Sequence, residues 1–351
     1  MSLSSSLAPL WADIAAGTAQ GYARDLAADA GATEAQLVAA GIGHGATCLD
    51  IDWISALPRL EDLGEVKIIT RNDAIVHEKV GSFGKMSIMQ STGLVLNGMV
   101  DLRIFFAHWQ HTFVVTTTSS RGPRTGIQIF DLHGNAVHKI YRTANTNGDA
   151  WDAFIGDFTA ADQSPELTVL APAQAPLLRA DTDVDVDGLR ARWAALKDVH
   201  HFHDMLKDSG VSRIQAMRLV GEPWAREVTS EALDLLLPQA ADSALPIMIF
   251  VGNPGCIQIH TGPVSKIVDH KGWINIMDPS FTLHAKRSDI TSAWVVRKPM
   301  HGTTITTVEL YDRHGDNCAI LCAQRDPSAP ERPEWTALAS SLPSPQTAAA
   351  A

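Results

Sequence analysis

Hydrophobic and polar residues alternate with the period of β-strands in two stretches of this chain, and each stretch follows a segment with helical periodicity. Helices are predicted up to about residue 60 and again over about 188–237, and strands over 66–141 and 247–323. Helices followed by many alternating strands are typical of α+β proteins with antiparallel sheets. The pattern predicts an α+β fold with a large antiparallel sheet and flanking helices in each half.

The two halves also match each other in sequence. Ile129–Asn135 resembles Leu310–Asp316, which lies 181 residues later, and Tyr22–Thr33 resembles His201–Ser212, 179 residues later. The first pair runs from an apolar strand pattern into an Asp-x-His-Gly turn and then into another apolar run, which indicates a β-hairpin. The chain is therefore expected to be a tandem structural repeat.

The domain boundaries follow from this repeat and from composition. A stretch rich in proline and aspartate, without apolar periodicity, separates the halves, and the end of the chain is rich in alanine and polar residues. The expected organisation is an N-terminal repeat, a linker, a C-terminal repeat and a disordered tail, over residues 1–160, 161–187, 188–343 and 344–351.

Composition excludes several classes of protein. The net charge of −11 makes nucleic acid an unlikely partner, so none is expected, and no apolar run is long enough for a membrane span, so no membrane insertion is expected. The four cysteines are too few and too unevenly spaced for a disulfide framework, which together with the lack of a secretory signal predicts a cytoplasmic protein. Cys318 and Cys322 are interpreted as small buried hydrophobic residues.

Histidines cluster in one predicted helix, Asp187–Gly210, which ends at a glycine suited to the C′ position. His201 falls on the polar side of this helix. His200 and His203 instead fall on an apolar stripe with helical spacing. The members of this stripe are Leu189, Trp193, Leu196, His200 and His203.

Three interpretations of this cluster remain open on the residues alone. The imidazoles could be packed core side chains, share a zinc ion, or supply an axial ligand to haem. In the N-terminal repeat, Gly21 and Tyr22 occupy the positions of His200 and His201. A histidine needed only for the fold should occur in both copies, so this asymmetry favours a binding site.

Several local motifs, in this order and spacing, give the chain a resemblance to a known family. From about residue 20 to 340 it resembles the HemS/HmuS/PhuS-type cytoplasmic haem-utilisation proteins of Gram-negative bacteria. The motifs are Thr70–Gly81, Asp101–Phe106, Val199–Leu206, Val211–Arg213 and Trp294–Pro299.

The resemblance implies a haem site in the C-terminal repeat, with haem b as the cofactor. His200 matches the family's proximal iron ligand, His201 and His203 resemble alternative ligands, and Arg103 matches the distal arginine. His77 matches a second family histidine. Arg213 and Lys298 resemble cations of the haem pocket, and further candidates for polar contacts are Tyr311, Arg297 and Arg325. A slot for the flat, apolar haem ring could be formed by Phe105, Phe106, Phe202 and Met205.

The resemblance implies a protein that sequesters imported haem and delivers it for iron release, with a haem oxygenase or a haem importer component as a possible partner. The clustered histidines favour this carrier role because they offer exchangeable ligands. The first alternative is an enzyme that cleaves bound haem with an electron donor, in which Arg103 would be the distal catalytic residue. The second alternative is an interaction scaffold without a cofactor.

Overall fold

A computed structural model describes residues 2–120, 122–172, 179–326 and 329–345. The chain forms two compact units. The first contains residues 1–71, 77–173 and 252–258, and the second contains 72–76, 174–251 and 259–351. Each unit thus includes a short piece of chain from the other half of the sequence. The continuous ranges predicted from the sequence do not include this exchange.

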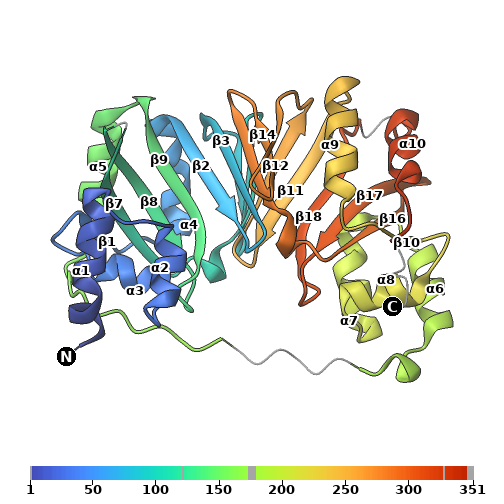
Figure 1. Cartoon of the computed structure of the whole chain (residues 1–351), viewed down its shortest axis with the longest axis horizontal. Helices are drawn as coiled ribbons and strands as arrows, with labels where there is room; N and C mark the ends of the chain where they lie inside the picture. The colour runs from blue at the N-terminus through green and yellow to red at the C-terminus, as the bar shows by residue number, and fades with distance from the viewer. Residues whose placement is uncertain (1, 121, 173–178, 327–328, 346–351) are drawn as a thin grey trace. The chain divides into compact units, whose positions relative to one another are not determined.

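The first unit begins and ends with helices, and shorter helical elements lie between some of its strands (Figure 1). They are α1 (Leu3–Ala16), α2 (Ala23–Asp29), α3 (Glu34–Ala39), α4 (Trp53–Ala56), η1 (Leu57–Leu63), η2 (Phe106–His108) and α5 (Gly148–Phe158). Its strands are β1 (Ala46–Leu49), β2 (Gly64–Arg71), β4 (Met86–Met89), β5 (Thr92–Asn97), β6 (Val100–Phe105), β7 (His111–Ser119), β8 (Gly122–Phe130) and β9 (Ala136–Thr146).

The second unit has a similar order of elements, with two additional short 3-10 helices before its first strand. Its helical elements are η3 (Asp181–Asp183), α6 (Val186–Ala194), η4 (Val199–His201), α7 (Phe202–Ser209), α8 (Arg213–Val220), α9 (Ala232–Asp242), η5 (Arg287–Asp289) and α10 (Pro333–Ser341). Its strands are β10 (Ala225–Val228), β13 (Ile267–His270), β14 (Trp273–Met277), β15 (Phe281–Lys286), β16 (Ser292–Met300), β17 (Thr303–Tyr311) and β18 (Asn317–Ala323). The unit boundaries cross three further strands, β3 (Ile75–Ser82), β11 (Ile247–Asn253) and β12 (Cys256–Gly262).

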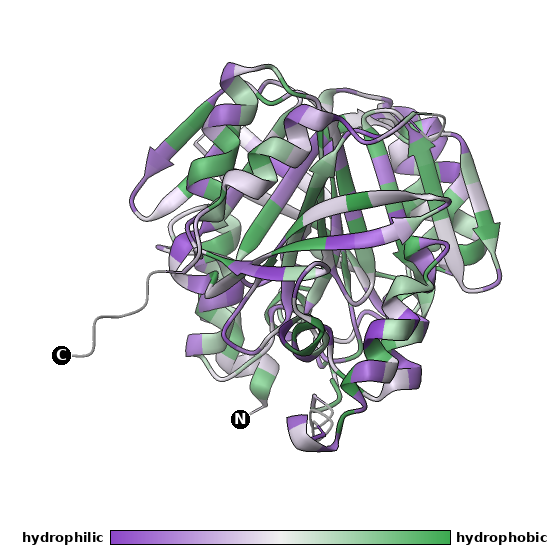
Figure 2. Cartoon of the chain, turned by 90° about the vertical axis from the view of Figure 1, so that its right-hand side faces the viewer, coloured by the Kyte–Doolittle hydropathy of each residue, from purple (hydrophilic) through white to green (hydrophobic). Residues whose placement is uncertain are grey.

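The sheets confirm the prediction of an α+β fold with a repeated antiparallel architecture. Strands follow the order β1-β7-β8-β9-β2 in the first unit and β10-β16-β17-β18-β11 in the second, so equivalent strands occupy equivalent places. In the first unit α1 and α3 contact β7, and α2 packs against α3. In the second unit α6 contacts β16, α8 contacts β10, and α7 packs against α6 (Figure 1). In Figure 2 many strands change between hydrophobic and hydrophilic colours along their length, as the sequence pattern predicts.

The two predicted hairpins are also confirmed. Asp131 accepts backbone N–H bonds at its side chain from His133 at 2.9 Å and Asn135 at 2.8 Å, at the turn between β8 and β9. Asp312 makes the same bonds to His314 and Asp316, at 2.8 and 2.9 Å, at the turn between β17 and β18. Each turn therefore uses an aspartate carboxylate to hold the chain reversal.

The predicted linker and tail lie partly outside the described residues, which omit 173–178 and 346–351. Before that gap, Gln163 hydrogen-bonds both backbone groups of Cys48, which joins this part of the chain to the first unit. The predicted burial of Cys318 and Cys322 is confirmed, since each is 4% exposed. In the described part of the chain, no helix is long and apolar enough to cross a membrane.

Candidate functional site

A buried carboxylate in the second unit organises several of the predicted pocket residues. Glu309, on β17, is completely buried and accepts hydrogen bonds from Arg213 Nε at 2.8 Å, Tyr311 Oη at 2.6 Å and Thr307 Oγ1 at 2.9 Å. Lys298 Nζ, from β16, forms an ion pair with the same carboxylate. The structure therefore brings Arg213, Lys298 and Tyr311 together, and Glu309 holds them.

This cluster carries more positive than negative charge. Burial by itself would raise the pKa of Glu309, but the charges of Arg213 and Lys298 outweigh it and hold that pKa well below its usual value. Burial lowers the pKa of Lys298 to about 8, although Glu309 acts against this shift. At neutral pH two cations thus face one carboxylate, and one positive charge remains for an anionic ligand.

The cation cluster also lies directly over an aromatic ring. Arg213 Cζ is 5.0 Å and Lys298 Nζ 4.5 Å from the ring centroid of Phe202, the first residue of α7. Phe202 packs edge-to-face on Trp193 with centroids 4.7 Å apart. Because Phe202 is two residues from His200, the cations and the histidine segment belong to one region of the second unit.

The corresponding place in the first unit has different charges. The repeat aligns Arg213 with Glu34 and Glu309 with Gln128. Glu34 forms a 2.5 Å ion pair with Lys139, a strand residue. Among these equivalent positions of the described residues, one cation matches one carboxylate in the first copy, whereas two cations face one carboxylate in the second.

The histidine segment differs from the single helix predicted over Asp187–Gly210. Helix α6 ends at Ala194, Asp198 adopts an extended backbone with φ −145° and ψ 133°, and the chain restarts through η4 into α7. Asp198 caps the new start by accepting the His200 backbone N–H at 2.9 Å, as aspartate favours N-cap positions. Gly210 ends α7 in the left-handed conformation, as predicted.

This break turns the histidines away from the core, so the prediction that His200 and His203 lie on the inward stripe is wrong. The His200 side chain is 80% exposed, and His201 and His203 are exposed as well. The inward face of α7 is formed instead by Phe202, Met205 and Leu206, and these bury more apolar surface than imidazoles would. All three histidines remain accessible to a ligand.

His200 is held by its neighbour in sequence. Its Nδ1 lies 2.5 Å from Oδ1 of Asp198, and Oδ2 of Asp198 lies 3.6 Å from Nε2 of His301. The pKa of Asp198 is lowered, mainly because its carboxylate accepts the backbone N–H of His200. The carboxylate therefore stays ionised at neutral pH.

Arg103 lies in the first unit, on β6, where it pairs with Leu94 of β5 and Ile257 of β12. Its guanidinium forms an ion pair with Asp101, and its side chain is 32% exposed. The partly exposed guanidinium is held by this carboxylate, which leaves further N–H groups to donate to a ligand.

His77 has a different environment from the other histidines. It is completely buried in β3, with Nδ1 2.8 Å from Nε2 of Gln258. Three of the residues expected to line a haem slot, Phe106, Phe202 and Met205, are buried in the apolar cores of their units. These three side chains and His77 thus have packing roles in this structure.

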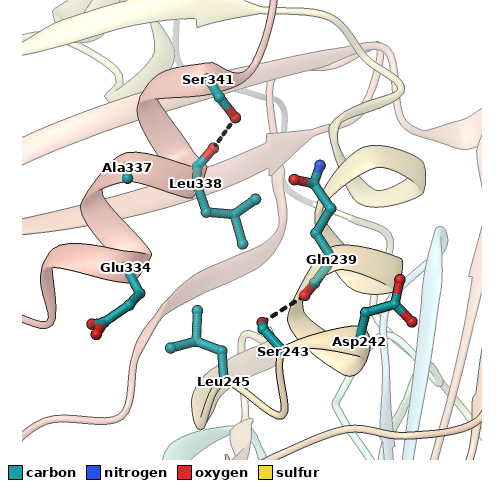
Figure 3. Close-up of a pocket in the computed structure, with 8 residues that line it drawn as sticks. All are labelled: Gln239, Asp242, Ser243, Leu245, Glu334, Ala337, Leu338 and Ser341. Carbon is teal, nitrogen blue, oxygen red and sulfur yellow. Dashed lines mark hydrogen bonds between the residues drawn. The ribbon is translucent and has the colours of Figure 1, made fainter.

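A groove and a smaller cavity lie among the described residues of the second unit, apart from the cation cluster. A groove of about 580 Å³ separates α9 from α10, with the carboxylates of Asp242 and Glu334 on opposite sides (Figure 3). None of the predicted site residues lines it, and its negative rim disfavours a carboxylate ligand. Arg325 lines a smaller cavity of about 90 Å³ with His301.

Sequence reasoning missed Glu309 and Asp198. A charged residue within the apolar alternation of β17 was a usable signal for Glu309, because a buried carboxylate requires cationic partners. The Asp-x-His spacing was a signal for Asp198, because an N-cap aspartate lies close to the second residue of the helix that it begins.

The fold and this region define a class of protein: a duplicated α+β protein whose second copy combines accessible imidazoles with two cations around one buried carboxylate. The family model described as "Haemin-degrading HemS.ChuX domain" matches residues 31–158 and 210–342, one segment in each half. The chain belongs to this HemS/ChuX family.

Similar proteins cover almost the whole chain. The hemin transport protein HemS of Yersinia enterocolitica is 40% identical over 315 residues, which is 90% of each chain. The crystal structure of holo-PhuS, a heme-binding protein from Pseudomonas aeruginosa, is 39% identical with a TM-score of 0.93 and covers 97% of this chain and 99% of that chain. The heme-degrading enzyme ChuS of Escherichia coli O157:H7 is 36% identical with a TM-score of 0.90, and the same shares of the two chains are covered.

Proposed function

We propose that this protein binds haem in the cytoplasm as a cargo of haem utilisation, holds it, and delivers it for iron release. The observation that carries the proposal is the place of Arg213 and Lys298 over Phe202, two residues from the exposed imidazole of His200. Haem offers the complementary chemistry. Its iron accepts an imidazole ligand, its ring is flat and apolar, and the ring carries two carboxylates.

Individual roles follow from this arrangement. His200 is proposed as the axial ligand, with His201 and His203 as exchangeable alternatives on the same exposed segment. Arg213 and Lys298 are proposed to bind a haem propionate, supported by Tyr311, and Arg325 is proposed as a peripheral cation. Haem b is the proposed form, because it carries the propionates that these cations would bind.

Haem titration of the purified chain tests this proposal. Wild-type protein should develop a Soret band at one haem per chain, and His200→Ala should shift the band or weaken binding. Wild-type protein should bind haem more tightly than Lys298→Met. For haem dimethyl ester, which lacks the propionate charges, most of this difference in affinity should disappear. Absence of a Soret band in wild type would favour the cofactor-free scaffold and refute haem binding.

Haem degradation is the second candidate, and the similarity to the heme-degrading enzyme ChuS favours it. In that role Arg103 is proposed as the distal residue, with the guanidinium orientation set by Asp101. The haem complex should be reduced without oxygen and then exposed to oxygen with catalase present. Tetrapyrrole cleavage would support the enzyme. The carrier would be supported if the protein accepts intact haem from a haem importer component or passes intact haem to a haem oxygenase.

A further inference from the structure

The carboxylate of Asp198 makes two separate contacts with His200. Oδ1 lies 2.5 Å from the ring Nδ1 and accepts the His200 backbone N–H at 2.9 Å. The Asp198 side chain is only 24% exposed, whereas the His200 side chain is 80% exposed. A partly buried carboxylate therefore holds a ring that is otherwise open to solvent.

Contacts that do not involve His200 also hold Asp198 in place. Its backbone carbonyl accepts the His201 N–H at 3.1 Å, which closes the 3-10 turn of η4. Its Oδ2 faces His301 Nε2 at 3.6 Å, and the His301 backbone N–H donates to the Lys197 carbonyl at 2.8 Å. The turn between β16 and β17 thus anchors the carboxylate, so its position does not depend on the ring that it orients.

This geometry selects one form of the His200 imidazole. A carboxylate at Nδ1 stabilises the tautomer in which Nδ1 carries the proton, and this leaves the lone pair on Nε2. Nε2 is then the nitrogen available to a metal. An anionic partner at Nδ1 also makes the ring a stronger electron donor, as carboxylate–histidine pairs do at metal sites.

The internal repeat provides independent support. With the alignment that matches His201 to Tyr22, Asp198 corresponds to Ala19 and His200 to Gly21. The first copy lacks both the imidazole and its carboxylate. An aspartate required only to start the helix should have been kept without the histidine, so the two residues behave as a unit.

We propose that Asp198 is a positioning residue for the iron ligand: it holds His200 with Nδ1 protonated and Nε2 directed to the haem iron, and it strengthens the donor. This inference rests on the proposed function. It adds a residue that acts through His200 and is not itself a ligand.

The first test uses the protein without haem. NMR of ¹⁵N-histidine-labelled chain at pH 8.5, where exposed imidazoles are neutral, reports the tautomer of each ring. His200 should carry its proton on Nδ1 in wild type. It should change to the Nε2–H form, which free imidazole side chains prefer in water, in Asp198→Ala. An identical tautomer in both proteins would overturn the inference.

The second test measures haem in a background with His201→Gln and His203→Gln, so that His200 is the ligand available in this segment. Asp198→Ala should raise the haem Kd by roughly 10- to 100-fold and lower the ferrous iron–histidine stretching frequency. Asp198→Asn keeps an acceptor without the charge and should fall between. Asp208→Ala, which removes an exposed carboxylate from the following helix α7, is the control and should match the background.

The two failures are distinguishable. If the background protein binds haem and Asp198→Ala leaves both its Kd and its iron–histidine frequency unchanged, the positioning role is refuted while the proposed function stands. If the wild-type chain binds no haem, both are refuted.

Discussion

Replacement of Glu309 by glutamine tests the charge balance of the second unit. The carboxylate is completely buried and accepts from Arg213, Tyr311 and Thr307 while it pairs with Lys298. Glu309→Gln keeps the shape of the side chain but leaves two cations without their counter-charge. Breaking a buried ion pair by removing one partner costs about 3–5 kcal/mol. We expect a loss of this size in the stability of the unit.

Native-state hydrogen exchange of the amides in β16 and β17 measures this loss locally. A cost of about 3–5 kcal/mol corresponds to exchange that is faster by roughly 140- to 4,000-fold, at 1.4 kcal/mol for each factor of ten. Glu227→Gln, which neutralises an exposed glutamate on β10, is the control and should change stability by less than about 0.5 kcal/mol.

A second substitution separates charge from hydrogen bonding. Lys298→Met in the Glu309→Gln background removes one unpaired cation and should recover part of the lost stability, with a coupling energy of about 0.5–3 kcal/mol. A cost below about 1 kcal/mol for Glu309→Gln, or additive effects in the double variant, would contradict the buried, charge-coupled cluster.

Three further predictions concern other groups. Burial lowers the pKa of Lys298 from 10.5 to about 8, so the haem Kd should rise as pH increases from 7 to 9, and Lys298→Met should show no such rise. Lys298 should not make the protein less stable in this pH window, because its deprotonation favours the folded state. Arg103→Ala should alter the sixth-ligand state in the absorption spectrum more than the haem Kd, and an unchanged spectrum would remove Arg103 from the distal position. His77→Ala should destabilise the first unit by about 1–3 kcal/mol in urea unfolding, because Gln258 loses a buried partner, but should leave the Soret band unchanged.

Local pattern was sufficient for the repeated architecture. Alternation predicted strands over 247–323, and β11 begins at Ile247 while β18 ends at Ala323. The hairpins at Asp131 and Asp312 were predictable because an aspartate side chain bonds to backbone groups two and four residues later. Both features depend on residues that are close in the sequence, so the sequence of this one chain was enough to predict them.

The orientation of the histidine segment was not predictable from periodicity. The stripe through Leu196, His200 and His203 assumes one continuous helix, but the helix ends at Ala194 and restarts after Asp198. Either a continuous or a broken helix satisfies the local pattern. The choice depends on how much surface Phe202 buries against Trp193, and that is a property of the packed core.

The sequence by itself determined the fold class, the duplication, the hairpin turns and the candidate residue types, because each depends on spacing along the chain. Only the tertiary structure decided which charges meet. Arg213, Lys298 and Glu309 come from α8, β16 and β17, and the excess of one positive charge exists because folding brings all three together around a buried carboxylate. Burial strengthens the interaction of that excess charge with an anionic ligand, and burial cannot be assigned until distant segments are packed.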